Sequence, residues 1–236
     1  MIPKKIHYCW FGGNEKPKAV EKCIASWRKY CPDYEIIEWN EENFDIQQNP
    51  YIKYCYDNQK WAFLSDLARL LVVCEHGGIY FDTDVELIKN PDFLLEYGAF
   101  YGFETAEYVN TGEGFGAQAH HPTLESMIEE YSKLEADENG KFPTITCPNL
   151  NTQALLPFGL KKNGEKQLLL ENALILPIEY MNPYDDPKGV LNKTENTVSI
   201  HWYSKSWMSK KTILRSKLMK PFHRVFGNDC FRWLKK

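Results

Sequence analysis

Two aspartates, Asp82 and Asp84, directly follow the apolar run Ile79-Tyr80-Phe81 and are the residues best suited to chemistry. Two carboxylates two positions apart can reach one hard cation once the chain leaves a strand, and oxygen ligands of this kind suit Mg²⁺ or Mn²⁺. A divalent cation held there could stabilise the negative charge that builds up on a departing diphosphate. Because an Asp-x-Asp also occurs in solvated turns, its neighbours must decide between the two interpretations.

A charged pair precedes these aspartates on the clearest helix that the sequence predicts, over residues 58–76. Asp66 and Arg69 stand three positions apart and therefore share one helical face. The residues around them are apolar, so both charges are expected at the border of the core, where a charge needs a partner or a task. A simple surface ion pair is the alternative. Gly77-Gly78 ends the helix directly before the acidic segment.

The elements that must position these residues follow an α/β pattern. Residues 4–11 read as a strand, residues 17–30 as a helix and residues 34–39 as a second strand, and this order indicates parallel pairing. Ligands bind at the carboxyl ends of strands in open α/β sheets, so the acidic segment is expected at that edge. Further strands are predicted at residues 99–103, 114–118, 173–177 and 197–201, and a further helix at 122–134.

The composition indicates one folded domain with a short appendage. The chain has 236 residues, of which 43% are hydrophobic and 25% are charged, and a domain takes roughly 100 to 200 residues. No segment has the roughly 18 consecutive apolar residues that span a bilayer. The seven cysteines are scattered without a C-x-x-C pair, which predicts neither a disulfide framework nor a zinc site and favours a cytoplasmic location.

The net charge of −4 hides an asymmetry between the body and the tail of the chain. Residues 205–236 contain seven Lys and three Arg against one Asp, a balance of +9 that leaves residues 1–204 at −13. Apolar residues are interleaved with these basic residues, which is typical of an interfacial helix on anionic lipid. A terminal helix that packs its apolar stripe on the domain is the alternative. We therefore expect a catalytic domain over residues 1–204 and a basic amphipathic helical tail over residues 205–236.

Beyond these patterns, the sequence resembles glycosyltransferase family 32. These glycosyltransferases have a DxD-containing sugar-binding region, include enzymes of capsular and surface polysaccharide synthesis, and are distantly similar to the catalytic domain of the clostridial glucosylating toxins. The resemblance is carried by residues 2–12 (IPKKIHYCWFG), Ser26-Trp27, residues 31–35 (CPDYE), residues 65–69 (SDLAR), residues 77–84 (GGIYFDTD) and the pattern His-x-x-x-x-Ser-Trp at residues 201–207. A family pattern Gly-Pro-x-x-x-Thr appears at residues 147–152 without its glycine, which weakens the resemblance in that loop.

The resemblance implies a GT-A type nucleotide-diphospho-sugar transferase fold, an α/β class with a Rossmann-like mixed sheet flanked by helices. It implies that Asp82 and Asp84 bind Mn²⁺ or Mg²⁺, and that His201 completes the metal site. Asp66 and Arg69 would hold the hydroxyl groups of the donor sugar and the phosphate side. These four charged residues form the core of the expected catalytic set.

Other positions are expected to contact the donor or the acceptor. Trp10 would stack near the nucleotide base, and Ser206 with Trp207 would close over the phosphates. Asn110 would approach the reacting carbon from the acceptor side as a further catalytic residue. The remaining expected donor contacts are His7, Ser65 and Tyr80. Ordinary packing is the alternative for Trp10 and for the segment from His201 to Trp207, and a simple turn is the alternative for Asn110.

The expected function is the metal-dependent transfer of a hexose from a nucleotide sugar, with UDP-hexose as the first choice. The resemblance implies a retaining reaction, and a saccharide or lipid-linked saccharide acceptor in bacterial surface polysaccharide synthesis. The expected location is the cytoplasm, with peripheral contact at the inner face of the membrane, and no nucleic acid partner is expected. The alternatives are a haloacid-dehalogenase-like phosphatase, because residues 79–85 also fit an apolar strand followed by D-x-D-x-[TV], and a non-catalytic carbohydrate-binding relative.

Overall fold

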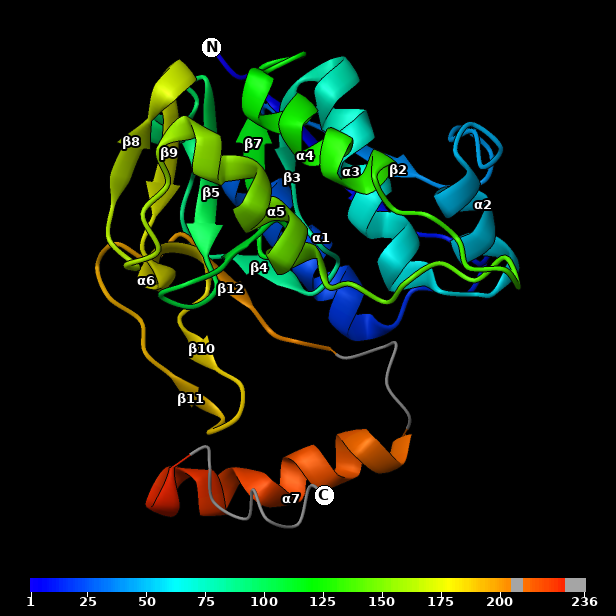
Figure 1. Cartoon of the computed structure of the whole chain (residues 1–236). Helices are drawn as coiled ribbons and strands as arrows, with labels where there is room; N and C mark the ends of the chain where they lie inside the picture. The colour runs from blue at the N-terminus through cyan, green and yellow to red at the C-terminus, as the bar shows by residue number, and fades with distance from the viewer. Residues whose placement is uncertain (205–209, 228–236) are drawn as a thin grey trace.

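A mixed sheet of eight strands forms the centre of the molecule (Figure 1). The structure is a computed structural model that describes residues 1–204 and 210–227. Along the main path the strands run in the order β2-β1-β3-β7-β5-β9-β8, and β6 pairs with β5 off this path. The strands of this sheet are β1 (Lys5–Cys9), β2 (Glu35–Trp39), β3 (Gly78–Tyr80), β5 (Ala99–Phe103), β6 (Val109–Asn110), β7 (Phe115–Ala117), β8 (Gln167–Leu169) and β9 (Ala173–Leu176).

Strand pairing changes direction across the sheet. β1 is parallel to β2 and β3, and β9 is parallel to β5, whereas β7 is antiparallel to both β3 and β5. Parallel neighbours need a crossover connection, and helix α1 (Lys18–Tyr30) supplies it between β1 and β2. The expected α/β class, with a mixed sheet flanked by helices, is confirmed.

The segment before the two aspartates is buried between two layers of helices. Ile79 and Phe81 belong to the apolar cluster that contains α1, whereas Tyr80 belongs to the cluster that contains α3 (Trp61–His76). This alternation is the period of two that a strand imposes on its side chains. None of these three side chains is more than 1% exposed. The packing around them therefore holds the start of the acidic turn in a defined position.

Gly77 and Gly78 allow α3 to end against β1. Both have positive φ angles, +61° and +122°. A Cβ atom on Gly78 would lie 2.8 Å from Nε2 of His7 and 3.0 Å from the carbonyl oxygen of Lys5. Only glycine fits this close approach, and the approach brings β3 alongside β1.

Several elements in the described part of the chain have no counterpart among the predicted ones. These are α2 (Pro50–Asp57), α5 (Cys147–Leu155), α6 (Ile178–Met181), β4 (Val85–Leu87), β6, β8, the hairpin of β10 (Tyr184–Asp185) and β11 (Val190–Leu191), and the short 3₁₀ turns at Asp92–Leu94, Leu156–Phe158 and Leu170–Asn172. Most of them are too short to show a periodic pattern. α5 begins at Cys147-Pro148, where a loop was expected, and a proline in the first turn suits a helix start.

Three further elements remain to be placed. They are α4 (Pro122–Ser132), β12 (Ser199–His201) and α7 (Lys210–Phe226). β12 pairs antiparallel with β4 in a small separate sheet. Figure 1 shows this small sheet below the central one, and α7 beyond the β10–β11 hairpin.

Candidate active site

The acidic segment forms a tight turn between β3 and β4. The backbone amide of Val85 donates to the carbonyl oxygen of Asp82 at 3.0 Å. β4 then pairs with β12, which places Val85 opposite His201. The backbone amide of Ser204 donates to Oδ2 of Asp84 at 2.7 Å. The last strand therefore brings His201 next to aspartates that lie more than a hundred positions earlier in the chain.

Asp82, Asp84 and His201 each offer one ligand atom, and these three atoms lie within 4.8 Å of one another. Nε2 of His201 is 3.4 Å from Oδ1 of Asp84. Two carboxylates provide the oxygen ligands that Mg²⁺ and Mn²⁺ prefer, and an imidazole nitrogen is compatible with a transition metal such as Mn²⁺. The donor chemistry of this cluster therefore fits the divalent cation expected from the sequence.

Asp84 and His201 also influence each other's protonation. Burial alone would raise the pKa of Asp84, but His201 and the hydrogen bonds from Ser204 hold that pKa below its usual value. Burial alone would lower the pKa of His201, yet the neighbouring Asp84 raises it overall. Asp84 is therefore ionised at neutral pH, in the form that can bind a cation.

Arg69 joins helix α3 to the acidic turn. Its guanidinium forms ion pairs with Asp66 and, at 3.3 Å, with Oδ2 of Asp82. Its Nε donates to the carbonyl oxygen of Ser65 at 3.1 Å. The hydroxyl of Tyr80 donates to Oδ1 of Asp82 at 3.0 Å. Both carboxylate oxygens of Asp82 thus have a protein partner that fixes their direction.

The two carboxylates around Arg69 differ in exposure. The side chain of Asp66 is 12% exposed and that of Asp82 is 29% exposed, whereas that of Arg69 is 3% exposed. Burial raises the pKa of Asp66 to about 6 although the Arg69 charge opposes this rise. Burial also raises the pKa of Asp82. Asp82 keeps an accessible edge for a ligand, and the charge of Arg69 opposes the rise in the pKa of both acids.

The loop after β6 lines the other side of Asp82, and sequence reasoning missed most of it. The backbone amide of Asp82 donates to the carbonyl oxygen of Gly112 at 3.2 Å. A Cβ atom on Gly112 would lie 2.6 Å from Oδ2 of Asp82 and 2.8 Å from Nη1 of Arg69. A side chain at this position would therefore displace the ion pair. A single glycine in a polar loop carries no pattern from which this role could be predicted.

Asn110, an expected catalytic residue, shapes this loop. Its side-chain oxygen accepts hydrogen bonds from the Gly112 amide at 2.7 Å and from the Cys147 thiol at 3.3 Å. Asn110 is 6% exposed. These contacts hold the loop in place beside Asp82, and the expected catalytic role of Asn110 stays a prediction.

The structure does not bring His7 to the donor side of the site. Its ring is fully buried, with Nε2 bonded to the carbonyl oxygen of Gly77 at 2.8 Å and Nδ1 accepting from Nε1 of Trp39 at 3.0 Å. Both ring nitrogens therefore have protein partners. The expectation that His7 contacts the donor is corrected, because no free nitrogen remains and the side chain is enclosed by packing.

Two further expected donor contacts are only partly available. Nε1 of Trp10 donates to the carbonyl oxygen of Asn14 at 2.7 Å, while the half-buried ring leaves part of its surface open. The hydroxyl of Ser65 is turned back onto α3, within 2.9 Å of the carbonyl oxygen of Ala62. Ser206 and Trp207 lie outside the described residues.

A buried acid that the sequence did not indicate lies in the same loop. Glu113 is fully buried, and neither of its carboxylate oxygens has a hydrogen-bond partner among the described residues. Burial raises its pKa well above the usual value of 4.5, and Glu104 raises it further. Glu113 is therefore expected to be uncharged at neutral pH.

Glu113 should make the protein less stable as pH rises. The folded state keeps the carboxyl proton, whereas the unfolded chain loses it above about pH 4.5, so stability falls between that pH and the folded pKa by up to about 1.4 kcal/mol per pH unit. Urea unfolding of Glu113→Gln and of the unmodified protein should show that the variant loses this component of the slope. Parallel pH profiles for the two proteins would contradict the assignment.

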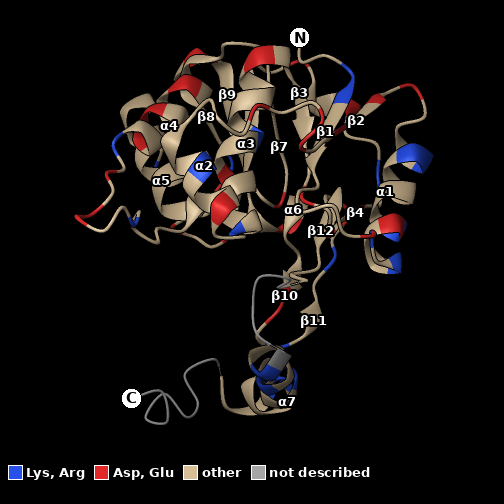
Figure 2. Ribbon diagram, turned by 90° about the vertical axis from the view of Figure 1, so that its right-hand side faces the viewer, with Lys and Arg blue, Asp and Glu red and all other residues tan. Residues whose placement is uncertain are grey.

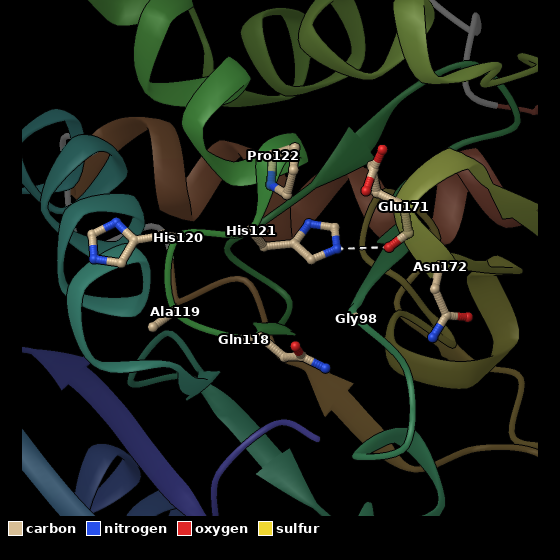
Figure 3. A pocket seen from close by; sticks show the side chains of 8 residues that line it. All are labelled: Gly98, Gln118, Ala119, His120, His121, Pro122, Glu171 and Asn172. Carbon is tan, nitrogen blue, oxygen red and sulfur yellow. Dashed lines mark hydrogen bonds between the residues drawn. The ribbon is translucent and has the colours of Figure 1, made fainter.

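Two hollows of about 280 Å³ each lie in the described part of the chain. One borders the acidic turn and is lined by Ala19, Val20, Lys22, Cys23, Thr83, Asp84, Glu86, Trp202 and Ser204. The other is shown in Figure 3, where His121 bonds to the carbonyl oxygen of Glu171 at 2.8 Å. None of the expected site residues lines this second hollow. The first hollow is therefore the one that continues the candidate site.

A comparison with known families decides how the acidic turn is interpreted. Residues 17–101 match the family described as "Glycosyltransferase sugar-binding region containing DXD motif". We call this matched segment the DXD-type region, after the family to which it is similar. The DXD-type region runs from just before α1 into β5 and contains Asp66, Arg69, Asp82 and Asp84. The resemblance to this family that the sequence motifs predicted is confirmed.

Curated relatives share this region. The chain is 28% identical over 155 residues to inositol phosphoceramide mannosyltransferase 1 of Schizosaccharomyces pombe, covering 61% of this chain and 47% of that protein. It is 30% identical over 139 residues to the uncharacterized glycosyltransferase L373 of Acanthamoeba polyphaga mimivirus, covering 55% of each. The chain thus spans about half the length of these relatives.

Solved structures of glycosyltransferases are also similar in part. The PaToxG glycosyltransferase is 21% identical, with a TM-score of 0.48 over 66% of this chain and 69% of that one. A glycosyltransferase involved in the glycosylation of the major capsid of PBCV-1 is 13% identical, with a TM-score of 0.43 over 92% of this chain and 100% of that one.

Proposed function

We propose that this protein is a metal-dependent glycosyltransferase of GT-A type that uses a nucleotide-sugar donor. The observation that carries this proposal is the meeting of Asp82, Asp84 and His201, with ligand atoms within 4.8 Å, beside the buried Asp66–Arg69 pair. The first two residues of the cluster lie in the DXD-type region. The third residue, His201, belongs to β12, which lies far along the chain from the two aspartates.

Each residue has a role that follows from its position. Asp82, Asp84 and His201 would hold Mn²⁺ or Mg²⁺, and the cation, when bound, neutralises charge on the donor diphosphate. Arg69 orients Asp82. The carboxylate of Asp66 and the guanidinium of Arg69 would also bind hydroxyl groups of the donor sugar in fixed directions.

The open side of the ring of Trp10 remains the proposed surface for the nucleotide base. Ser206 and Trp207 remain the proposed contacts to the phosphates.

The donor and acceptor are proposed at a finer level. We favour a UDP-hexose donor, retention of configuration by front-face displacement, and a saccharide or lipid-linked saccharide acceptor. Two relatives of Schizosaccharomyces pombe, inositol phosphoceramide mannosyltransferases 1 and 3, have names that pair a mannosyl group with a lipid, which supports the lipid-linked choice. A role in bacterial surface polysaccharide synthesis, with the enzyme in the cytoplasm at the inner face of the membrane, completes the proposal. NMR of the product tests retention.

A phosphatase of the haloacid-dehalogenase type is not favoured by the geometry. Such an enzyme would need a second acidic pair near Asp82, and the candidate pair in the sequence is Asp185-Asp186. That pair lies in the β10–β11 hairpin, where Lys188 contacts Asp185 at 2.8 Å and Lys220 contacts Asp186 at 3.2 Å. Figure 1 shows the hairpin projecting away from the central sheet.

Metal removal tests the proposed function. We expect the protein to hydrolyse one of a panel of UDP- and GDP-sugars slowly when Mn²⁺ is present and no acceptor is added, and EDTA to abolish this release. Binding of the same donor should raise the melting temperature only with Mn²⁺. Donor hydrolysis that survives chelation would contradict the metal site. Release of phosphate from an aryl phosphate would favour the phosphatase, and donor binding without any turnover would favour the non-catalytic relative.

A further inference from the structure

Helix α7 is attached to the rest of the molecule through its polar side. Nζ of Lys220 donates to the hydroxyl of Tyr184 at 2.8 Å and to Oδ1 of Asp186 at 3.2 Å. The guanidinium of Arg224 donates to the carbonyl oxygens of Lys188 and Gly189 at 2.7 and 2.9 Å. All four partners belong to the β10–β11 hairpin or its turn, and both views place the helix against the tip of this hairpin (Figures 1 and 2).

The opposite side of α7 is apolar and exposed. Leu214, Leu218 and Val225 are 59%, 64% and 73% exposed. At 3.6 residues per turn they lie about 120°, 160° and 140° from Lys220 around the helix axis. They therefore form one stripe that points away from the hairpin. The alternative in which the tail packs its apolar stripe on the domain does not hold for residues 210–227.

Basic residues flank this stripe on both sides. Measured in the same direction from Lys220, Lys217 lies at about 60°, on one side of the stripe. Lys211 and Arg215 lie at about 180° and 220°, on the other side of it. All three are exposed. The segment 210–226 contains no Asp or Glu, so nothing within the helix neutralises these charges. In Figure 2 the ribbon of α7 has Lys and Arg positions in blue and no Asp or Glu in red.

We propose that α7 is an interfacial helix that lies on an anionic lipid bilayer. An exposed apolar stripe with basic side chains on both sides matches the boundary between acyl chains and anionic headgroups. Within residues 1–204 and 210–227, no helix is long and apolar enough to cross a membrane. A helix of this composition binds in the plane of the surface, with Leu214, Leu218 and Val225 inserted and the hairpin above.

The hairpin links this surface to the candidate active site. The ring of Tyr184 packs against that of Trp202, with centroids 5.3 Å apart. The backbone amide of Trp202 donates to the carbonyl oxygen of Asp84 at 3.0 Å. Membrane contact through α7 would thus hold the acidic turn at a set distance from the bilayer. If the proposed function is correct, this arrangement selects an acceptor whose saccharide is attached to a membrane lipid.

Vesicle flotation of the full-length protein tests the helix. We expect binding to vesicles of 70% phosphatidylcholine and 30% phosphatidylglycerol at low salt, and little binding to phosphatidylcholine alone. The double variant Leu214→Glu/Leu218→Glu should lower the bound fraction at least tenfold. The matched control is Leu168→Glu/Leu170→Glu, which changes two leucines that are 61% and 63% exposed on the main body, and it should bind like the unmodified protein.

The outcomes separate the helix from the catalytic proposal. Donor hydrolysis in solution should be unchanged in Leu214→Glu/Leu218→Glu, which also shows that this variant folds. Failure of the unmodified protein to bind anionic vesicles would overturn the inference, as would equal binding by both double variants. A concentration-dependent dimer that only Leu214→Glu/Leu218→Glu abolishes, seen by sedimentation without vesicle binding, would assign the stripe to a second copy instead. Loss of donor hydrolysis in every protein would instead count against the proposed function.

Discussion

The variant Asp84→Asn should lose donor hydrolysis and transfer by on the order of 10² to 10³-fold, the size of effect seen when one preorganised electrostatic group is removed from an active site. Asp84 is ionised within the candidate metal cluster, since His201 and Ser204 hold its pKa below the usual value. An amide in its place has no charge to offer a cation. Calorimetric titration with Mn²⁺ should show a matching loss of affinity.

The fold should survive Asp84→Asn. The side-chain oxygen of an amide can still accept the hydrogen bond that the Ser204 amide now donates to Oδ2 at 2.7 Å. Asp57→Asn is a suitable control, because Asp57 is an exposed acid at the end of α2 that pairs with Lys53. It should keep full activity. Unchanged Mn²⁺ affinity in a folded Asp84→Asn protein would remove Asp84 from the metal site.

Arg69→Met should destabilise the protein by about 3 to 5 kcal/mol, because it leaves two carboxylates near the core without their partner. Arg69 is 3% exposed and contacts both Asp66 and Asp82. Urea unfolding followed by circular dichroism measures the change. The loss should be smaller at pH 5 than at pH 8, since the carboxylates can take up protons at the lower pH once the positive charge is gone.

A second variant distinguishes charge from packing in this result. Asp66→Asn/Arg69→Met removes one of the two carboxylate charges that Arg69→Met leaves unpaired. Its free energy of unfolding should be at least about 1 kcal/mol higher than that of Arg69→Met, as expected for residues that interact directly. If the double variant is no more stable than Arg69→Met, the loss comes from packing around the side chain. A cost below about 1 kcal/mol for Arg69→Met would show that the ion pairs contribute little.

The local patterns of the sequence determined the α/β class and the position of the acidic segment. The apolar stripe of α3, the two glycines that end it, and the buried run before Asp82 all act over a few residues. Such signals depend on helical or strand periodicity and on the backbone freedom of glycine, so they can be read without knowing the fold. The resemblance to the family was recognisable for the same reason, because each motif that carries it is a short run of neighbouring residues.

The C-terminal tail divides into a part that the sequence predicted and a part that it could not. The interleaving of basic and apolar residues predicted an amphipathic helix, and α7 occupies residues 210–226. The sequence left open which side would face the protein. That choice depends on the β10–β11 hairpin, whose two-residue strands show no pattern, and on carbonyl oxygens that accept from Arg224.

Tertiary structure alone decided which polar residues meet at the acidic turn and which are used elsewhere. The β4–β12 pairing brings His201 to Asp84, and the loop after β6 places Gly112 against Asp82 and Arg69. The same packing encloses His7, an expected donor contact, with both ring nitrogens bonded. Contacts between distant segments depend on strand order and register, which no local pattern encodes. The sequence therefore determined the two aspartates as a candidate, and the fold determined their third partner and the arginine that orients them.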